Sequence, residues 1–187
     1  MTRPIAAEAD RLQTLFVGQG ARAVDADILL SADTLLDLYG EDIRGRAYLT
    51  TDPFGGEMVL RPDFTVPVVQ KHMEDGADPA RYTYAGCVFR KQEDDPSRQR
   101  EAMQVGFEVF DGSDPAGADA TVFAAIADAL ASLPVRAATG DIGILMAAVA
   151  GLNTSDTRKA ALLRHLWRPR KFRALLDRFG GRTAPAP

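Results

Sequence analysis

The sequence predicts an α+β fold in which an antiparallel sheet is flanked by helices. Two strand-like runs, residues 82–90 and 101–110, flank a polar decapeptide, so we expect them to pair as antiparallel neighbours. A second pair of such runs, 47–51 and 57–61, is joined by the segment 52–56, whose Asp, Pro and Gly residues favour a tight connection. Helical segments precede, separate and follow these runs, an order that is typical of α+β proteins.

Apolar residues at helical spacing predict the helices. Residues 5–17 carry one apolar face and end before Gly18. Asp141 suits the N-cap of a helix that extends to Ala150. The segment 119–133 has an apolar stripe on one side, formed by Val122, Phe123, Ile126 and Leu130. Further helices are expected at 34–39, 66–74, 156–166 and 169–179, and a short strand at Val135–Thr139.

The composition is that of a globular protein with one main domain, since 46% of 187 residues are hydrophobic and 26% are charged. A net charge of -4 argues against general attraction to nucleic acid or membranes. The one cysteine, Cys87, excludes an internal disulfide, and its place in an apolar run predicts packing instead of nucleophilic chemistry. No apolar run reaches the roughly 20 residues that cross a bilayer, and the first residues lack a leader pattern. We expect a cytoplasmic protein.

The character of the chain changes after Gly151. Residues 158–182 contain nine Lys or Arg and one acid, Asp177, a local balance of +8, so the rest of the chain carries -12. Such runs are mostly solvated faces or partner contacts, and aromatic residues are few here, so tRNA binding is not expected. We therefore predict a core at 1–151, a basic helical segment at 152–182 and a disordered tail at 183–187.

Polar residues on the second long strand form a candidate binding surface. Residues two apart share a face, so Gln104, Gly106 and Glu108 point the same way. A glycine between polar side chains predicts an open floor where a ligand approaches the backbone. Arg90 and Arg98 would add donors suited to carboxylate or phosphate. On spacing alone, the pattern favours a sheet with one solvated face and a charged hairpin tip.

A second polar group lies at the end of the run 57–61. Asp63 and Glu108 together suit an ammonium group, while Thr65 and Gln104 would supply neutral hydrogen bonds. With an arginine for the carboxylate, this set suits an amino acid. The alternative is that Arg-Pro-Asp is a turn and that Asp63 caps the following helix. Two distant histidines and the lack of a glycine-rich phosphate loop predict neither a metal site nor a cofactor.

Four motifs together resemble histidyl-tRNA synthetase, a class II aminoacyl-tRNA synthetase. They are Leu60-Arg-Pro-Asp-Phe-Thr65, Tyr84-Ala-Gly-Cys-Val-Phe-Arg90, Arg98-Gln-Arg100 and Gln104-Val-Gly-Phe-Glu108. Asp63-Phe-Thr-Val-Pro67 and Gly140-Asp-Ile-Gly-Ile144 are more similar to the non-catalytic paralogue, the regulatory subunit of ATP phosphoribosyltransferase. The resemblance implies a class II synthetase-like antiparallel sheet flanked by helices. It also implies that the third motif lies beyond residue 187, so that the fold is incomplete at the C-terminus.

The resemblance implies a site as well as a fold. It assigns histidine binding to Asp63, Thr65, Arg98, Gln104 and Glu108, and a vestigial phosphate contact to Arg90. Gln92 stands where a synthetase has the glutamate that holds adenine, so no catalytic residue is expected; the alternative is that a small shift of the loop presents the adjacent Glu93 instead.

The implied role is regulatory. The family relationship predicts a non-catalytic subunit of a hexameric or octameric ATP phosphoribosyltransferase, which self-associates and partners the short-form catalytic subunit. It would be required for the first step of histidine biosynthesis and for feedback regulation by histidine. The alternative is an enzyme, a histidyl-tRNA synthetase or a fragment of one.

Overall fold

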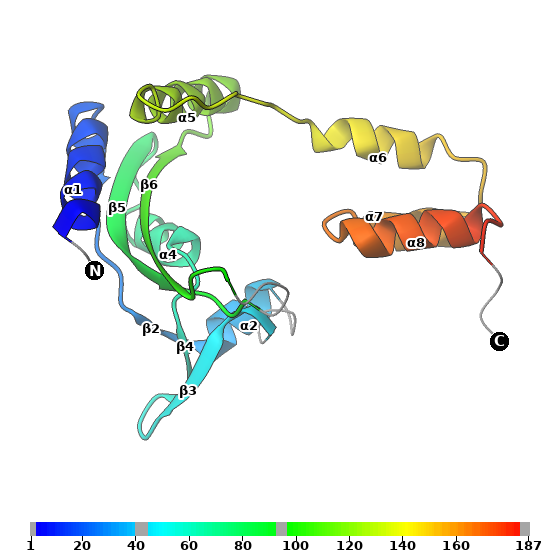
Figure 1. Ribbon diagram of the computed structural model, residues 1–187, viewed down its shortest axis with the longest axis horizontal. Helices are drawn as coiled ribbons and strands as arrows, with labels where there is room; N and C mark the ends of the chain where they lie inside the picture. Colours follow the sequence, from blue (N-terminus) through cyan, green and yellow to red (C-terminus); the bar gives the residue numbers. More distant parts are fainter. Residues whose placement is uncertain (1–2, 40–44, 93–96, 184–187) are drawn as a thin grey trace. The chain divides into compact units, whose positions relative to one another are not determined.

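The computed structural model describes residues 3–39, 45–92 and 97–183, and it divides the chain into the compact units Met1–Val135 and Arg136–Pro187 (Figure 1). The domain boundary expected at residue 151 directly follows helix α6 (Ile142–Ala150), inside the second unit. Residues 184–187 of the expected tail lie outside the described residues, as does Glu93 in the hairpin loop.

Sheet A of the first unit is built on the predicted hairpin. Strands β5 (Ala80–Phe89) and β6 (Glu101–Phe110) pair antiparallel over their whole length, with Tyr84 opposite Gly106. Strand β1 (Arg22–Ala23) adds a parallel edge beside β5. The hairpin prediction is confirmed, whereas β1 was not predicted because two residues carry no alternation that a sequence pattern can show.

Helices cover both faces of sheet A (Figure 1). They are α1 (Arg3–Gly18), α4 (Thr65–Asp75) and α5 (Pro115–Ala129). Phe107 faces α1 and α5 and contacts Phe16, with ring centroids 5.2 Å apart. On the other face, Tyr82 and Tyr84 pack with Val68 of α4. Because successive residues of a strand alternate in direction, the even-numbered residues of β5 and β6 all face the α4 side.

Sheet B contains the predicted second hairpin. Its strand order is β2 (Leu29–Ser31), β4 (Gly56–Leu60) and β3 (Tyr48–Asp52), all antiparallel. Helix α2 (Ala32–Tyr39) packs Leu35 against Val59 in a small core. Asp52 shapes the β3–β4 turn, since its Oδ1 accepts hydrogen bonds from the backbone N–H of Phe54 (2.8 Å) and of Gly55 (2.6 Å).

Helix α5 differs from its prediction at both ends and in its buried stripe, and it ends at Ala129 instead of residue 133. It begins at Pro115, four residues before the expected start at 119, because Asp114 caps it by accepting a hydrogen bond from Gly117 N–H at 3.0 Å. An Asp-Pro pair is a start signal of this kind. The buried residues also differ from the predicted stripe, since Ala125 and Ala129 are buried while Phe123 and Ile126, both in that stripe, are exposed.

The second unit consists of α6, α7 (Asp156–Arg164) and α8 (Pro169–Phe179), close to the predicted helices. Lys159 Nζ donates to the carbonyl of Ala150 at 2.7 Å, which ties α7 to the end of α6. The strand predicted at Val135–Thr139 is wrong, because no strand of the described residues pairs with this segment. Among the helices described, none is long and apolar enough to cross a membrane.

Candidate functional site

The segment between β4 and α4 lies on the α4 side of β5. Arg61 is 5% exposed, and its Nε donates to the carbonyl of Cys87 at 2.8 Å while Nη1 donates to the carbonyl of Ala26. Its guanidinium lies 4.1 Å above the centre of the Phe64 ring. Burial lowers the pKa of Arg61, an effect that the nearby Asp25 partly offsets. A Cβ at Gly86 would overlap both Arg61 and Phe64, so this glycine makes room for them.

Phe64 in turn holds Tyr84. Their rings stack with centroids 4.4 Å apart and an angle of 9° between the planes. The Tyr84 ring lies directly over Gly106, where any Cβ would overlap it. The open floor expected at Gly106 is therefore wrong: a tyrosine on the neighbouring strand fills the space that the missing side chain leaves. An aromatic ring laid across a facing glycine is a known stabilising pair in antiparallel sheets.

The Tyr84 hydroxyl joins the two polar residues that flank Gly106. It donates to Glu108 Oε1 at 3.0 Å and accepts from Gln104 Nε2 at 3.3 Å. Gln104 Oε1 accepts from Arg90 Nη2 at 3.2 Å, and Arg90 Nε donates to the carbonyl of Pro62 at 2.6 Å. A continuous chain of hydrogen bonds thus runs from the guanidinium of Arg90 to the carboxyl of Glu108.

Two acidic residues, Glu108 and Asp63, lie at one end of this series of hydrogen bonds. Burial raises the pKa of Glu108, the hydrogen bond from Tyr84 opposes that rise, and the charge of Asp63 adds to it. Burial and the charge of Glu108 also raise the pKa of Tyr84 well above its ordinary value, so the hydroxyl keeps its proton. Within the described ranges neither Asp63 nor Glu108 forms an ion pair. Two carboxylates without a cation are suited to receive one.

The structure brings most of the predicted site residues together. Arg90, Gln104 and Glu108 belong to the hydrogen-bond chain, and Asp63 lies close enough to Glu108 to perturb its pKa. Asp63 Oδ1 also accepts from the backbone N–H of Thr65 at 3.1 Å, as expected of a turn residue. The N-cap position of α4 is Phe64 and has no side-chain capping bond, so the turn part of the alternative interpretation is confirmed and the capping part is wrong.

Two predicted residues are placed less centrally. Thr65 is exposed at the first position of α4. Arg98 is exposed in the segment that leads into β6, and the hydrogen-bond chain forms without it.

The residues that sequence reasoning missed are Arg61, Phe64 and Tyr84. A signal for Tyr84 was available, because it lies opposite Gly106 once the hairpin is paired in register.

Comparison with known proteins places this fold in a family. A sequence model described as histidyl-tRNA synthetase matches residues 2–183. The chain belongs to the histidyl-tRNA synthetase family. Two curated relatives, from Sinorhizobium fredii and Mesorhizobium japonicum, are both named ATP phosphoribosyltransferase regulatory subunit. The first is 30% identical over 184 residues and the second 39% identical over 160 residues. These alignments cover 96% and 81% of this chain but only 46% and 41% of the relatives, so the chain spans less than half of their length.

Solved structures confirm the class II synthetase-like α+β fold. An ATP phosphoribosyltransferase regulatory subunit/histidyl-tRNA synthetase from Bacillus halodurans C matches with a TM-score of 0.70 and 25% identity, covering 91% of this chain and 46% of that one. A histidine–tRNA ligase subunit from Alicyclobacillus acidocaldarius shares the fold, with a TM-score of 0.68, 22% identity and coverage of 92% and 51%.

Gln92 occupies the position where the resemblance of this chain to the synthetases predicts a glutamate. Its side-chain Nε2 donates to the carbonyl of Gln99 at 3.1 Å, which joins the two arms of the β5–β6 hairpin near its tip. An ionised glutamate has no proton to donate and could not make this bond. The residue at position 92 thus serves the loop itself in this member of the histidyl-tRNA synthetase family.

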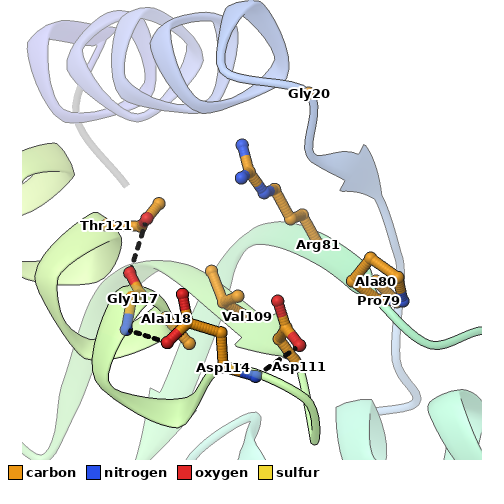
Figure 2. Close-up of a pocket in the computed structure, with 10 residues that line it drawn as sticks. All are labelled: Gly20, Pro79, Ala80, Arg81, Val109, Asp111, Asp114, Gly117, Ala118 and Thr121. Atoms are coloured by element: carbon orange, nitrogen blue, oxygen red, sulfur yellow. Dashed lines mark hydrogen bonds between the residues drawn. The ribbon is translucent and has the colours of Figure 1, made fainter.

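A cleft of about 490 Å³ opens on the opposite face of sheet A, between the end of α1 and the start of α5 (Figure 2). Its polar groups are engaged in local structure. Arg81 Nη1 donates to the carbonyl of Gln19 at 2.9 Å, and Asp114 caps α5. Asp111 Oδ1 accepts from the Ser113 hydroxyl at 2.7 Å, a bond that lowers the pKa of Asp111. None of the predicted histidine-binding residues lines this cleft.

Proposed function

We propose that this chain forms the histidine-binding part of a non-catalytic regulatory subunit of ATP phosphoribosyltransferase. The observation that carries the proposal is the pair of unpaired carboxylates, Asp63 and Glu108, at one end of a hydrogen-bond chain that ends in Arg90. The names of the Sinorhizobium and Mesorhizobium relatives support it. By the same proposal, the partner is the short-form catalytic subunit, and the regulatory chain also self-associates.

The chemistry of the site fits a zwitterionic amino acid. Asp63 and Glu108 would receive the ammonium group, since charge-assisted hydrogen bonds to carboxylates are stronger than neutral ones. Arg90 would face the carboxylate, with Arg98 as a second cation contributed by the hairpin loop. Gln104 and Thr65 would bind the imidazole, which both donates and accepts hydrogen bonds.

Binding without chemistry is sufficient for regulation. Histidine changes the activity of a partner only if it binds one arrangement of the complex more tightly than another. The bond from Gln92 to Gln99 supports a loop that is organised without an adenine-binding carboxylate at that position. The chain therefore needs to bind histidine and touch its partner, and need not transfer any group.

The test is a histidine titration by calorimetry, on the full chain alone and mixed with a short-form ATP phosphoribosyltransferase. We expect saturable binding that Asp63→Asn weakens about tenfold or more, since the asparagine retains the oxygen that accepts from Thr65 N–H and loses the charge. Asp52→Asn is the matched control, because Asp52 makes the same kind of turn at the distant β3–β4 connection and should leave binding unchanged.

The mixture decides between regulatory and enzymatic readings. We expect phosphoribosyltransferase activity to depend on the added chain and to fall as histidine is added. Activity that is the same with and without the chain would contradict the regulatory proposal. Histidine-dependent exchange between ATP and pyrophosphate would instead favour a histidyl-tRNA synthetase.

A further inference from the structure

The direction of every hydrogen bond in the chain from Arg90 to Glu108 is fixed by chemistry. A guanidinium has only donors, so Gln104 must turn its carbonyl oxygen toward Arg90. Its amide N–H groups then face Tyr84, whose oxygen accepts one of them. The single hydroxyl proton of Tyr84 is left to donate to Glu108. While Glu108 is ionised, no other arrangement satisfies all three bonds.

We propose that Tyr84 is a positioning residue that makes this site selective for a ligand with a cationic donor at the Glu108 end. This inference rests on the proposed function. With its only proton engaged by Glu108, Tyr84 offers nothing to an incoming carbonyl or hydroxyl acceptor. At the Glu108 end, the described groups beside it are acceptors, namely the remaining carboxylate lone pairs of Glu108 and the carboxylate of Asp63, whereas the second amide N–H of Gln104 belongs to the opposite side of the hydroxyl. An ammonium group is matched at the Glu108 end, and a neutral acceptor is disfavoured there because it would face carboxylate oxygens that have no proton to donate.

The rigidity of the ring makes this positioning effective. Tyr84 is 3% exposed, it is stacked on Phe64, and its other side is fixed by the backbone of Gly106. The hydroxyl therefore has one location, between Gln104 and Glu108. A freely rotating side chain would lose orientation entropy on each hydrogen bond, whereas this one is ordered before a ligand arrives.

Titratable groups around Glu108 come from several elements. Tyr84 of β5 and Asp63 of the segment before α4 act on it directly, and Arg90 lies beyond Gln104. His72 of α4 is engaged elsewhere, with Nδ1 at 3.2 Å from the Tyr82 hydroxyl. Loss of the Tyr84 proton donor removes the hydrogen bond that, among the described residues, favours the ionised form of Glu108. The carboxyl then takes up a proton at higher pH.

The test compares Tyr84→Phe with Tyr82→Phe in the full chain. Tyr84→Phe retains the ring, its stack on Phe64 and its place over Gly106, but removes the hydroxyl. Tyr82 is the matched control, since it lies on the same strand and face with its hydroxyl turned to His72. Histidine binding is measured by calorimetry between pH 5.5 and 8.5, and thermal unfolding is recorded for each variant.

We expect Tyr84→Phe to raise the Kd for histidine about tenfold at pH 7.5, in the range for losing a hydrogen bond to a charged group. We also expect the acid side of its binding curve to shift to higher pH. Tyr82→Phe should change neither. A wild-type Kd and pH profile in Tyr84→Phe, or equal effects of both variants, would overturn the proposal. A weaker Kd with an unchanged pH profile would overturn it as well, because a purely structural role moves affinity without moving the pH profile.

A measurement without ligand separates this inference from the proposed function. The Glu108 carboxyl is titrated by carbon-13 NMR in the wild-type chain and in Tyr84→Phe. We expect its pKa to be higher in the variant, and an unchanged pKa would refute the role of Tyr84 even if histidine fails to bind. Absence of histidine binding in the wild-type chain, with the pKa change present, would refute the proposed ligand alone.

Discussion

Two tyrosines on the same face of the same strand have different surroundings in this protein. The Tyr82 cluster consists of Tyr82, His72 and Phe110; His72 stacks on Phe110 with centroids 3.9 Å apart, and Tyr82 meets Phe110 edge-on at 5.6 Å. The Tyr84 cluster consists of Tyr84 with Phe64 and Gly106, and its hydroxyl bonds to Glu108. One hydroxyl is satisfied by a ring nitrogen inside an aromatic group, and the other by a carboxylate.

The difference comes from the facing strand. Phe110 closes the Tyr82 cluster with a ring, so all its members pack on one another. Gly106 has no side chain, so the Tyr84 ring lies over its backbone. Gln104 and Glu108, two positions to either side of Gly106, supply the polar groups. Tyrosine thus contributes mainly packing in the Tyr82 cluster, and a hydroxyl group with a fixed position in the Tyr84 cluster. The β6 residue that each ring packs against, Phe110 for Tyr82 and Gly106 for Tyr84, decides which.

Gly106→Ala breaks the Tyr84 cluster with the largest expected effect. The new methyl group would overlap the Tyr84 ring, so the ring must move away from position 106. This movement would break the stack on Phe64 and the hydrogen bond to Glu108. We expect the free energy of unfolding to fall by about 3 kcal/mol, the upper range for overpacking. Urea denaturation measures this free energy. Gly18→Ala is the control, because nothing lies within 4 Å of a Cβ built at Gly18. Equal stability of the two variants would contradict the position of the Tyr84 ring over Gly106.

Phe110→Ala tests the Tyr82 cluster and separates packing from binding. The substitution removes the ring contacts with His72 and Tyr82. Because Phe110 is only half-buried, we expect a loss of about 2 kcal/mol, less than for a fully buried ring. The Kd for histidine should stay at the wild-type value when measured below the unfolding temperature. A tenfold weaker Kd would show that the two clusters act as one site.

The sequence predicted the strands because alternation and turn residues are local signals. The hairpin of 82–90 and 101–110, the turn at 52–56 and the grouping of Gln104 with Glu108 all follow from such patterns. Helix α5 was predicted, but its start was placed at 119 instead of Pro115, although the Asp-Pro start signal was local as well. The strand at Val135–Thr139 failed because a strand requires a partner, which an apolar run does not specify.

The site was less predictable because it depends on contacts between distant segments. Gly106 alone suggests open space, and only the paired register shows that Tyr84 fills it. The sequence around Arg61 predicts a turn. The side chain is nevertheless buried and donates to the carbonyls of Cys87 and Ala26, which are 26 and 35 residues away in sequence. Long-range packing of this kind has no signature in spacing, so the polar residues were found while the aromatic scaffold that orients them was not.

Glu108→Gln carries the smallest expected effect and tests the charge that separates the clusters. The raised pKa of Glu108 means that the ionised carboxyl is less favourable in the folded than in the unfolded chain. This cost is present above the folded pKa and vanishes as pH falls below the unfolded value of about 4.3. Glutamine has no charge and can still accept from Tyr84. We therefore expect the variant to be more stable than wild type at pH 8, by less than about 1 kcal/mol because the carboxyl is partly solvated.

The measurement is thermal unfolding from pH 4 to pH 8, where the advantage of Glu108→Gln should shrink toward zero at the acid end. The matched control is Glu74→Gln on the exposed surface of α4, for which no such trend is expected. A variant that is less stable than wild type at pH 8 would mean that the carboxylate is stabilised by the cluster. In that case the charge at Glu108 is already balanced inside the folded chain, and the Glu108 end of the hydrogen-bond chain has no need of a cationic ligand.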